Sequence, residues 1–107
     1  HKLFNPEVYF GKFIGVNIPE GEPERVVLKF KNNIGKYILT QPIHNSQKLI
    51  KENGDTHEFE YLIGINQEFI SIVLGWGEHV EVMESFALRS HIRRVLRNTM
   101  NEYDKSR

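Results

Sequence analysis

The strongest structural signals of the chain lie in two adjoining stretches, Gly75-Trp76-Gly77-Glu78-His79-Val80-Glu81-Val82-Met83-Glu84 and Phe86-Ala87-Leu88-Arg89-Ser90-His91-Ile92-Arg93-Arg94-Val95-Leu96. The glycines predict an abrupt helix end, because glycine adopts the backbone conformations that helix termini need. Alternating apolar residues then predict a short strand over 79–84. Ser85 is suited to cap a long amphipathic helix from Phe86 to Asp104.

Upstream of this stretch the chain continues to alternate between strand and helix patterns. Period-two alternation predicts a strand over 24–31, and Asn33 is expected to cap a short helix that ends before Pro42. Asn53-Gly54 is a dipeptide favoured in two-residue hairpin turns. It predicts a hairpin of strands over 43–52 and 55–65, in a register that pairs the following residues: Glu52 with Asp55, Ile50 with His57, Lys48 with Phe59 and Ser46 with Tyr61.

A second helix is expected after Asn66, which is a favoured capping residue. The resulting order, β-α-β-β-α-β followed by a helix, predicts an α+β domain of the ferredoxin-like class with an antiparallel sheet and an added C-terminal helix. We expect the domain to span residues 24–107 and residues 1–23 to be a lead-in from a missing upstream domain. Five apolar side chains should be nearly fully buried: Phe30, Phe59, Ile72, Val82 and Leu96.

The composition excludes several classes of function. The 107 residues suffice for one domain, and 14 Lys and Arg balance 14 Asp and Glu, so bulk attraction to nucleic acid is not expected. The absence of cysteine excludes disulfides and thiolate metal sites and is typical of a reducing cytoplasm. The five histidines are scattered, and no nucleophile elbow or phosphate-binding loop is present. We therefore expect no enzyme activity, no cofactor, no metal and no membrane association.

The outward positions of the predicted sheet argue against RNA binding of the kind that stacks bases on a β-sheet. That mode needs aromatic side chains on the exposed face. Here the exposed face is expected to carry Arg25, Val27 and Lys29 on the first strand and Glu58 and Glu60 on the third.

Two polar clusters remain as candidates for binding. The run from His44 to Lys48 carries several donors at the start of an edge strand; it either contacts a ligand or partner, or satisfies backbone groups at a turn. Arg89, Arg93 and Arg97 follow one another at i, i+4 and i+8 on the last helix. Such a stripe either meets phosphates or an acidic neighbour, or is a solvated face. Arg89 and Arg93 are expected to face away from the core, so the fold should not depend on them.

Several short motifs together resemble a known family. They are Val26-Val27-Leu28-Lys29-Phe30, His44-Asn45-Ser46-Gln47, Asn53-Gly54-Asp55, Leu74-Gly75-Trp76-Gly77, Val80-Glu81-Val82 and Leu88-Arg89 with Ile92. From about Glu24 to Tyr103 the chain resembles the C-terminal extension (WCX) domain of WYL-domain bacterial transcriptional regulators. Asn45 departs from the proline of the family's His-Pro-Ser-Gln element, and Ser85 stands where the family often has proline.

This resemblance implies a C-terminal domain that senses an effector and helps a cytoplasmic homodimer to form. It would work with the WYL domain of the same chain or of the partner protomer, and DNA would be bound only through a missing N-terminal domain. The implied effector is anionic, such as a nucleotide or single-stranded nucleic acid. Its candidate contacts are Lys29, His44, Ser46, Gln47, Lys48, Arg89, Arg93 and Arg97. The alternatives are a small-molecule domain of the amino-acid-sensor kind and a pure oligomerisation module.

Overall fold

The computed structural model describes residues 22–105, so nearly all of the lead-in expected over residues 1–23 lies outside the described residues. The fold is a mixed α+β domain, as predicted, and its elements occur in the predicted order. They are β1 (Glu24–Phe30), α2 (Ile34–Thr40), β2 (Lys48–Asn53), β3 (Thr56–Ile63), α3 (Gln67–Trp76), the 3₁₀ turn η1 (Gly77–His79), β4 (Val80–Glu84) and α4 (Phe86–Lys105).

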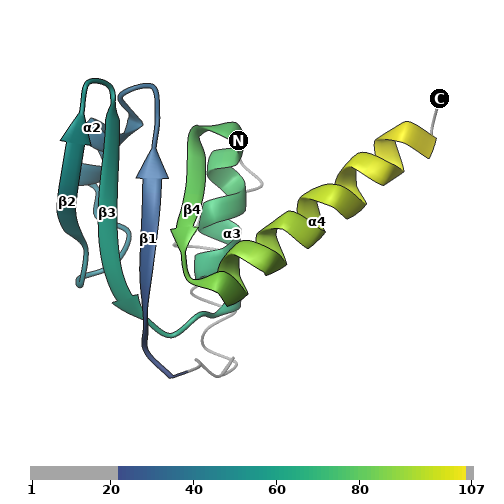
Figure 1. Cartoon of the computed structure of the whole chain (residues 1–107), viewed down its shortest axis with the longest axis horizontal. Coiled ribbons are helices and arrows are strands. Elements are labelled where there is room, and N and C mark those ends of the chain that lie inside the picture. The colour runs from purple at the N-terminus through teal and green to yellow at the C-terminus, as the bar shows by residue number, and fades with distance from the viewer. Residues whose placement is uncertain (1–21, 106–107) are drawn as a thin grey trace.

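The four strands form one antiparallel sheet in the order β2-β3-β1-β4. Helices α2 and α3 lie behind the sheet in Figure 1, whereas α4 runs away from it. The sheet therefore has an inner face covered by two helices and an outer face without them. The start of α4 adjoins β4 at one edge of the sheet.

The inner face of the sheet and the covering helices form the hydrophobic core. Aromatic rings meet edge to face there, with the ring centroid of Phe30 lying 6.0 Å from that of Phe59 and 6.1 Å from that of Trp76. Such pairs add to the stabilisation from burial. The core side chains are Val26, Leu28, Phe30, Ile38, Phe59, Tyr61, Ile63, Phe69, Val73, Val82, Leu88 and Ile92.

The predicted core is confirmed for Phe30, Phe59 and Val82, while Ile72 is only partly buried. The prediction for Leu96 is wrong, because 49% of its surface is exposed. Its position on the apolar side of α4 was deduced correctly, but the helix extends past the sheet after Ile92. The periodicity of a sequence identifies the apolar side of a helix, but it does not show how far along the helix the sheet extends.

The hairpin between β2 and β3 forms at the predicted place with a different register. Asn53 pairs with Thr56, so the loop residues are Gly54 and Asp55, and Gly54 has a φ of 64°. Every pair is shifted from the expected one, and a bulge at Ile50 shifts the register again. The predicted pairing of Lys48 with Phe59 is therefore wrong; Lys48 lies opposite Glu60.

The helix caps were predicted correctly at two of three positions. The Asn66 side chain accepts a hydrogen bond from the backbone N–H of Phe69 at 2.9 Å, and the Ser85 hydroxyl accepts one from Leu88 at 3.2 Å. Asn33 precedes α2 in a left-handed conformation, and its side chain makes no capping bond. The start of α2 is instead held by a backbone bond from the Asn33 N–H to the Asp55 carbonyl, 2.9 Å long.

Helix α2 lies unusually close to β3. A Cβ atom added to Gly35 would stand 2.3 Å from Cγ of His57, so only glycine fits at this point of the helix. The His57 ring is buried and stacks on the ring of Phe59. Neither of its nitrogens has a hydrogen-bond partner among the described residues, although a carboxylate oxygen of Glu52 lies 3.4 Å from Nε2.

Candidate ligand- and partner-binding surface

The segment from Ile43 to Gln47 is a tightly bonded loop and not the start of a strand. The Gln47 side chain connects three parts of the fold: its Oε1 accepts from the Tyr61 hydroxyl at 2.7 Å and from the Ile43 N–H at 3.1 Å, and its Nε2 donates to the Ile38 carbonyl at 3.1 Å. Burial raises the pKa of the Tyr61 phenol above its usual value, which keeps it a neutral donor. Gln47 therefore fixes the loop to β3.

His44 and Ser46 complete this loop. The Ser46 hydroxyl accepts from the Leu62 N–H at 3.0 Å, and the Ser46 N–H donates to Nδ1 of His44 at 3.1 Å. These bonds replace the ladder expected for a strand over 43–52, which is why β2 begins only at Lys48. Because Nδ1 accepts a hydrogen bond, a neutral His44 carries its proton on Nε2.

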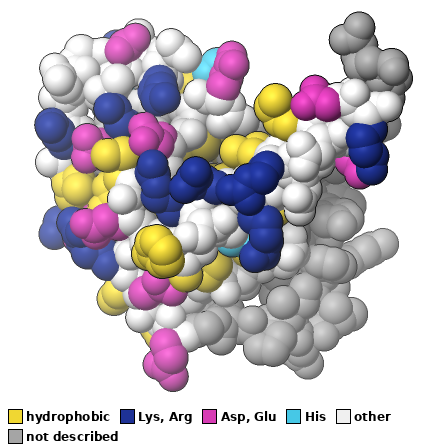
Figure 2. Space-filling model, turned by 45° about the vertical axis from the view of Figure 1, so that its right-hand side comes forward, with side chains coloured by type: hydrophobic (Ala, Val, Ile, Leu, Met, Phe, Trp, Pro, Cys, Tyr) yellow, Lys and Arg dark blue, Asp and Glu magenta, His cyan; other side chains and the backbone are white. Residues whose placement is uncertain are grey.

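Alternating charges cover the outer face of the sheet. Lys29 lies opposite Glu58 on β3 and opposite Glu81 on β4, and Lys48 lies opposite Glu60. The candidate cations of the sheet thus face carboxylates that are distant in sequence. Figure 2 shows Lys and Arg side chains in a row, with acidic side chains near it.

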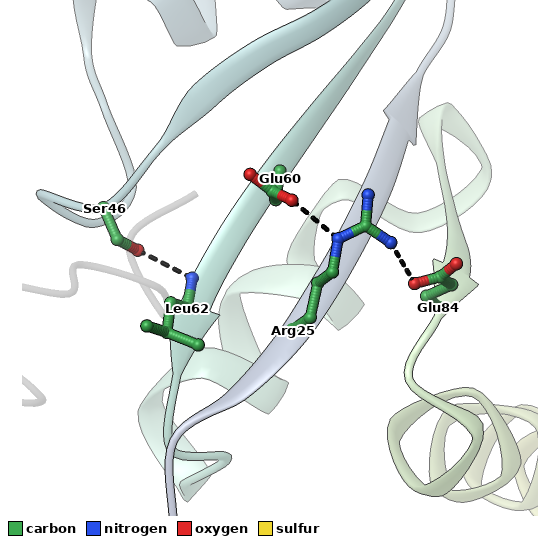
Figure 3. A network of polar contacts seen from close by, with 5 residues as sticks. All are labelled: Arg25, Ser46, Glu60, Leu62 and Glu84. Atoms are coloured by element: carbon green, nitrogen blue, oxygen red, sulfur yellow. Dashed lines mark hydrogen bonds and ion pairs between the residues drawn. The ribbon is translucent and has the colours of Figure 1, made fainter.

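Arg25 lies near one end of this face, on the inner strand β1, and was not among the predicted site residues. Its Nε donates to Oε2 of Glu60 at 2.6 Å, and its Nη1 donates to Glu84, so one guanidinium joins three strands (Figure 3). The hydrogen bond from Arg25 lowers the pKa of the Glu60 carboxyl, against the opposing effect of desolvation. The sequence did place Arg25 on the same face of the sheet as Glu58 and Glu60. The contact with Glu84 could not be predicted, because it depends on the pairing of β1 with β4.

The three arginines of the predicted stripe on α4 differ in what they contact. Arg89 Nη1 donates to the Val82 carbonyl at 2.6 Å and lies 3.5 Å from a carboxylate oxygen of Glu81. Arg89 therefore joins α4 to β4, and the expectation that it has no part in the fold is wrong. Within residues 22–105, Arg93 and Arg97 have no acidic partner. They are the two candidate arginines left for an external anion.

The structure thus divides the eight candidates into separate groups. His44, Ser46 and Gln47 belong to the loop at the β2 edge, where their side chains serve the fold. Lys29 and Lys48 lie on the outer face, on β1 and β2 respectively, with β3 between those strands. The arginines lie beyond the opposite edge, on α4, and only Arg89 reaches back to the sheet.

Residues 22–100 match the family described as the WCX domain. The chain belongs to this family. The match covers all four strands, α2, α3 and α4 as far as Met100, and it confirms the resemblance drawn from the sequence motifs. Membership indicates a regulatory C-terminal domain and supports the context of WYL-type regulators. No curated protein matches the chain.

One small pocket of the WCX domain lies beside the His44 loop. It is lined by apolar side chains of α3 and β3 together with polar atoms of His44, Asn66 and Glu68, and its volume is about 130 Å³. Small-molecule sites usually have volumes of about 300–1,000 Å³. This pocket does not favour a nucleotide or a drug-sized ligand. Within residues 22–105, no helix combines the length and the apolar character needed to span a membrane.

Proposed function

We propose that this WCX domain is the effector-sensing and dimerisation part of a homodimeric, cytoplasmic WYL-type transcriptional regulator, and that it acts without catalysis. The family match over residues 22–100 carries this proposal. The domain would pass its signal to a DNA-binding domain elsewhere in the regulator. The succession β-α-β-β-α-β and the strand order β2-β3-β1-β4 support classing it as ferredoxin-like.

The proposed effector is anionic and meets the outer face where β1, β4 and α4 come together. Lys29 lies opposite Glu81, Arg89 binds Glu81, and Arg93 follows one helical turn later. Arginine forks and lysine ammonium groups both suit phosphate oxygens. A phosphate held by Lys29 and Arg93 would compete with Glu81 for Arg89 and so change the contact between α4 and the sheet. Through this competition, binding of the effector would alter the position of α4 relative to the sheet.

The experiment measures binding of two probes, a fluorescein-labelled single-stranded DNA oligonucleotide and a fluorescent adenine nucleotide, to the intact regulator by fluorescence anisotropy. Each charge-assisted hydrogen bond contributes roughly 1.5–3 kcal/mol. Replacing Lys29 and Arg93 together by Ala should therefore weaken binding of at least one probe by at least about tenfold. The salt dependence of that binding should become shallower.

Lys36→Ala is the matched control, because Lys36 is an exposed cation on α2, on the other side of the sheet. It should leave binding unchanged. Equal affinity of the double variant and the control would contradict the proposed anion site. An intact regulator that binds neither probe but remains dimeric would favour the pure oligomerisation module.

A further inference from the structure

The turn between β2 and β3 is open and unhindered. Asn53, Gly54 and Asp55 are exposed, and no heavy atom outside the chain neighbours of Gly54 lies within 4 Å of the place that a Cβ atom on this glycine would take. Within residues 22–105, the Asn53 carboxamide makes no hydrogen bond, and neither does the Gly54 N–H. The side chain of Asn53 and the backbone nitrogen that follows it are therefore both free to react.

These two groups can react with each other, because glycine carries no side chain to obstruct their approach. The Gly54 nitrogen would attack Cγ of Asn53 and form a bond to it. The bond from Cγ to Nδ2 then breaks, and the side-chain nitrogen leaves as ammonia with the proton of the Gly54 N–H. Water opens the resulting cyclic imide at either of its carbonyls, and the product at position 53 is aspartate or isoaspartate.

The other asparagines of the described residues are held by hydrogen bonds at the reacting groups. The N–H of the following residue donates a bond of 2.9, 3.0 or 3.1 Å at three positions in turns: Asn32, Asn33 and Asn45. At Asn98 and Asn101 the following N–H belongs to the ladder of α4. At Asn66 the side-chain oxygen itself accepts from the Phe69 N–H. Asn53 thus differs from each of them.

We propose that Asn53 is a site of spontaneous modification, at which the folded chain converts its own asparagine to aspartate and isoaspartate. The inference is independent of the proposed effector site. Cyclisation rotates the backbone at Asn53, so its pairing with Thr56 has to open. This is the last pair before the loop, and pairing there opens more readily than in the core strands. The reaction therefore needs only a local opening of the hairpin.

Isoaspartate at this position would disturb the fold beyond the turn. Its main chain runs through Cβ, so the strand gains a carbon atom and the former backbone carbonyl becomes a free carboxylate. In the unmodified chain the Asn53 carbonyl accepts from the Thr56 hydroxyl at 2.9 Å. The same turn carries the Asp55 carbonyl, which accepts from the Asn33 N–H at the start of α2. Isoaspartate should therefore loosen both the hairpin and the attachment of α2, whereas aspartate adds only a charge.

The test incubates the chain in mildly alkaline buffer, either folded or denatured in urea, and quantifies the products at each asparagine by peptide mass spectrometry. The rate in the denatured chain reports the effect of the following residue alone, so the ratio of the folded rate to the denatured rate isolates the effect of the fold. Asn45 is the matched comparison, because its loop is fixed to β3 through Ser46 and Gln47. The ratio should be at least about fivefold higher at Asn53, since each further hydrogen bond that must break lowers the reactive population by about that factor.

A ratio at Asn53 no higher than that at Asn45 would overturn the proposal. The consequence for the fold has its own test, in which the isoaspartate form is separated from the aged chain and unfolded in urea beside Asn53→Asp. The isoaspartate form should unfold at a lower urea concentration, and equal midpoints would contradict the loosening of the hairpin. Asn53→Gln keeps an exposed amide but forms the cyclic imide far more slowly. It should hold its midpoint when aged in parallel; an equal fall in this variant would place the damage at another residue and count against Asn53.

Discussion

The sheet with its covering helices, here called the body, and the outer half of α4 (Arg93–Lys105) present similar apolar residues in opposite environments. In the body, Phe30, Phe59 and Leu28 are completely buried between the sheet and its helices. On α4, Leu96 and Met100 are exposed along one stripe. The same residue types thus stabilise the fold in one region and remain exposed in the other. The boundary between the regions falls after Ile92, the last core residue within residues 22–105.

The largest effect is expected in the body. Phe59→Ala removes a ring that packs against Phe30 and His57, and it should lower the free energy of unfolding by about 3–5 kcal/mol. Urea denaturation followed by circular dichroism measures this change. Leu96→Ala is the matched control on α4 and should change the free energy of unfolding by less than about 0.5 kcal/mol. Equal losses for the two variants would remove the distinction between the regions.

A smaller loss in the free energy of unfolding is expected for a substitution where α2 approaches β3. Gly35→Ala places a methyl group against the buried ring of His57, whose atoms are enclosed by the core. Overpacking of this kind costs about 1–3 kcal/mol. The same denaturation experiment measures it. If Gly35→Ala raised the stability, as alanine does at an uncrowded helical position, the close approach of α2 and β3 would be incorrect.

The smallest expected effect is a difference in stability between two arginine variants, Arg89→Ala and Arg93→Ala, at the boundary between the regions. Arg89→Ala loses the hydrogen bond to the Val82 carbonyl and should cost about 1 kcal/mol. Arg93→Ala, one turn further along α4, removes no bond within the described residues and should leave the free energy of unfolding unchanged. Thermal unfolding of the two variants side by side tests the difference. A loss in Arg93→Ala equal to that in Arg89→Ala would place the boundary further along the helix.

The sequence predicted the body well because its signals are local. Alternation over β1, the Asn66 and Ser85 caps and the glycines at the end of α3 each depend on a few neighbouring residues. The hairpin register was predicted incorrectly because the two loop residues are Gly54 and Asp55 and not Asn53 and Gly54, and because a bulge at Ile50 shifts the pairing again. The dipeptide Asn53-Gly54 places the turn correctly but does not specify which two residues form the loop.

The candidate surface was predicted less well because it depends on which strands are neighbours. Lys29 and Arg89 stand without acids nearby in sequence, yet in the fold each meets Glu81. The two carboxylates bound by Arg25 come from β3 and β4, and only the sheet order places them on either side of β1. Leu96 was assigned to the core for a related reason, since periodicity does not show how far the sheet extends.

Removal of the outer turns of α4, from Asn98 onward, tests the division of the molecule most directly. A chain that ends at Arg97 keeps Leu88, Ile92 and the bond of Arg89 to β4, and loses Met100 and Tyr103. Urea denaturation at a protein concentration too low for association should give a free energy of unfolding within about 0.5 kcal/mol of that of the full chain. A loss of several kcal/mol would show that these outer turns are part of the folded body, and would contradict a boundary after Ile92.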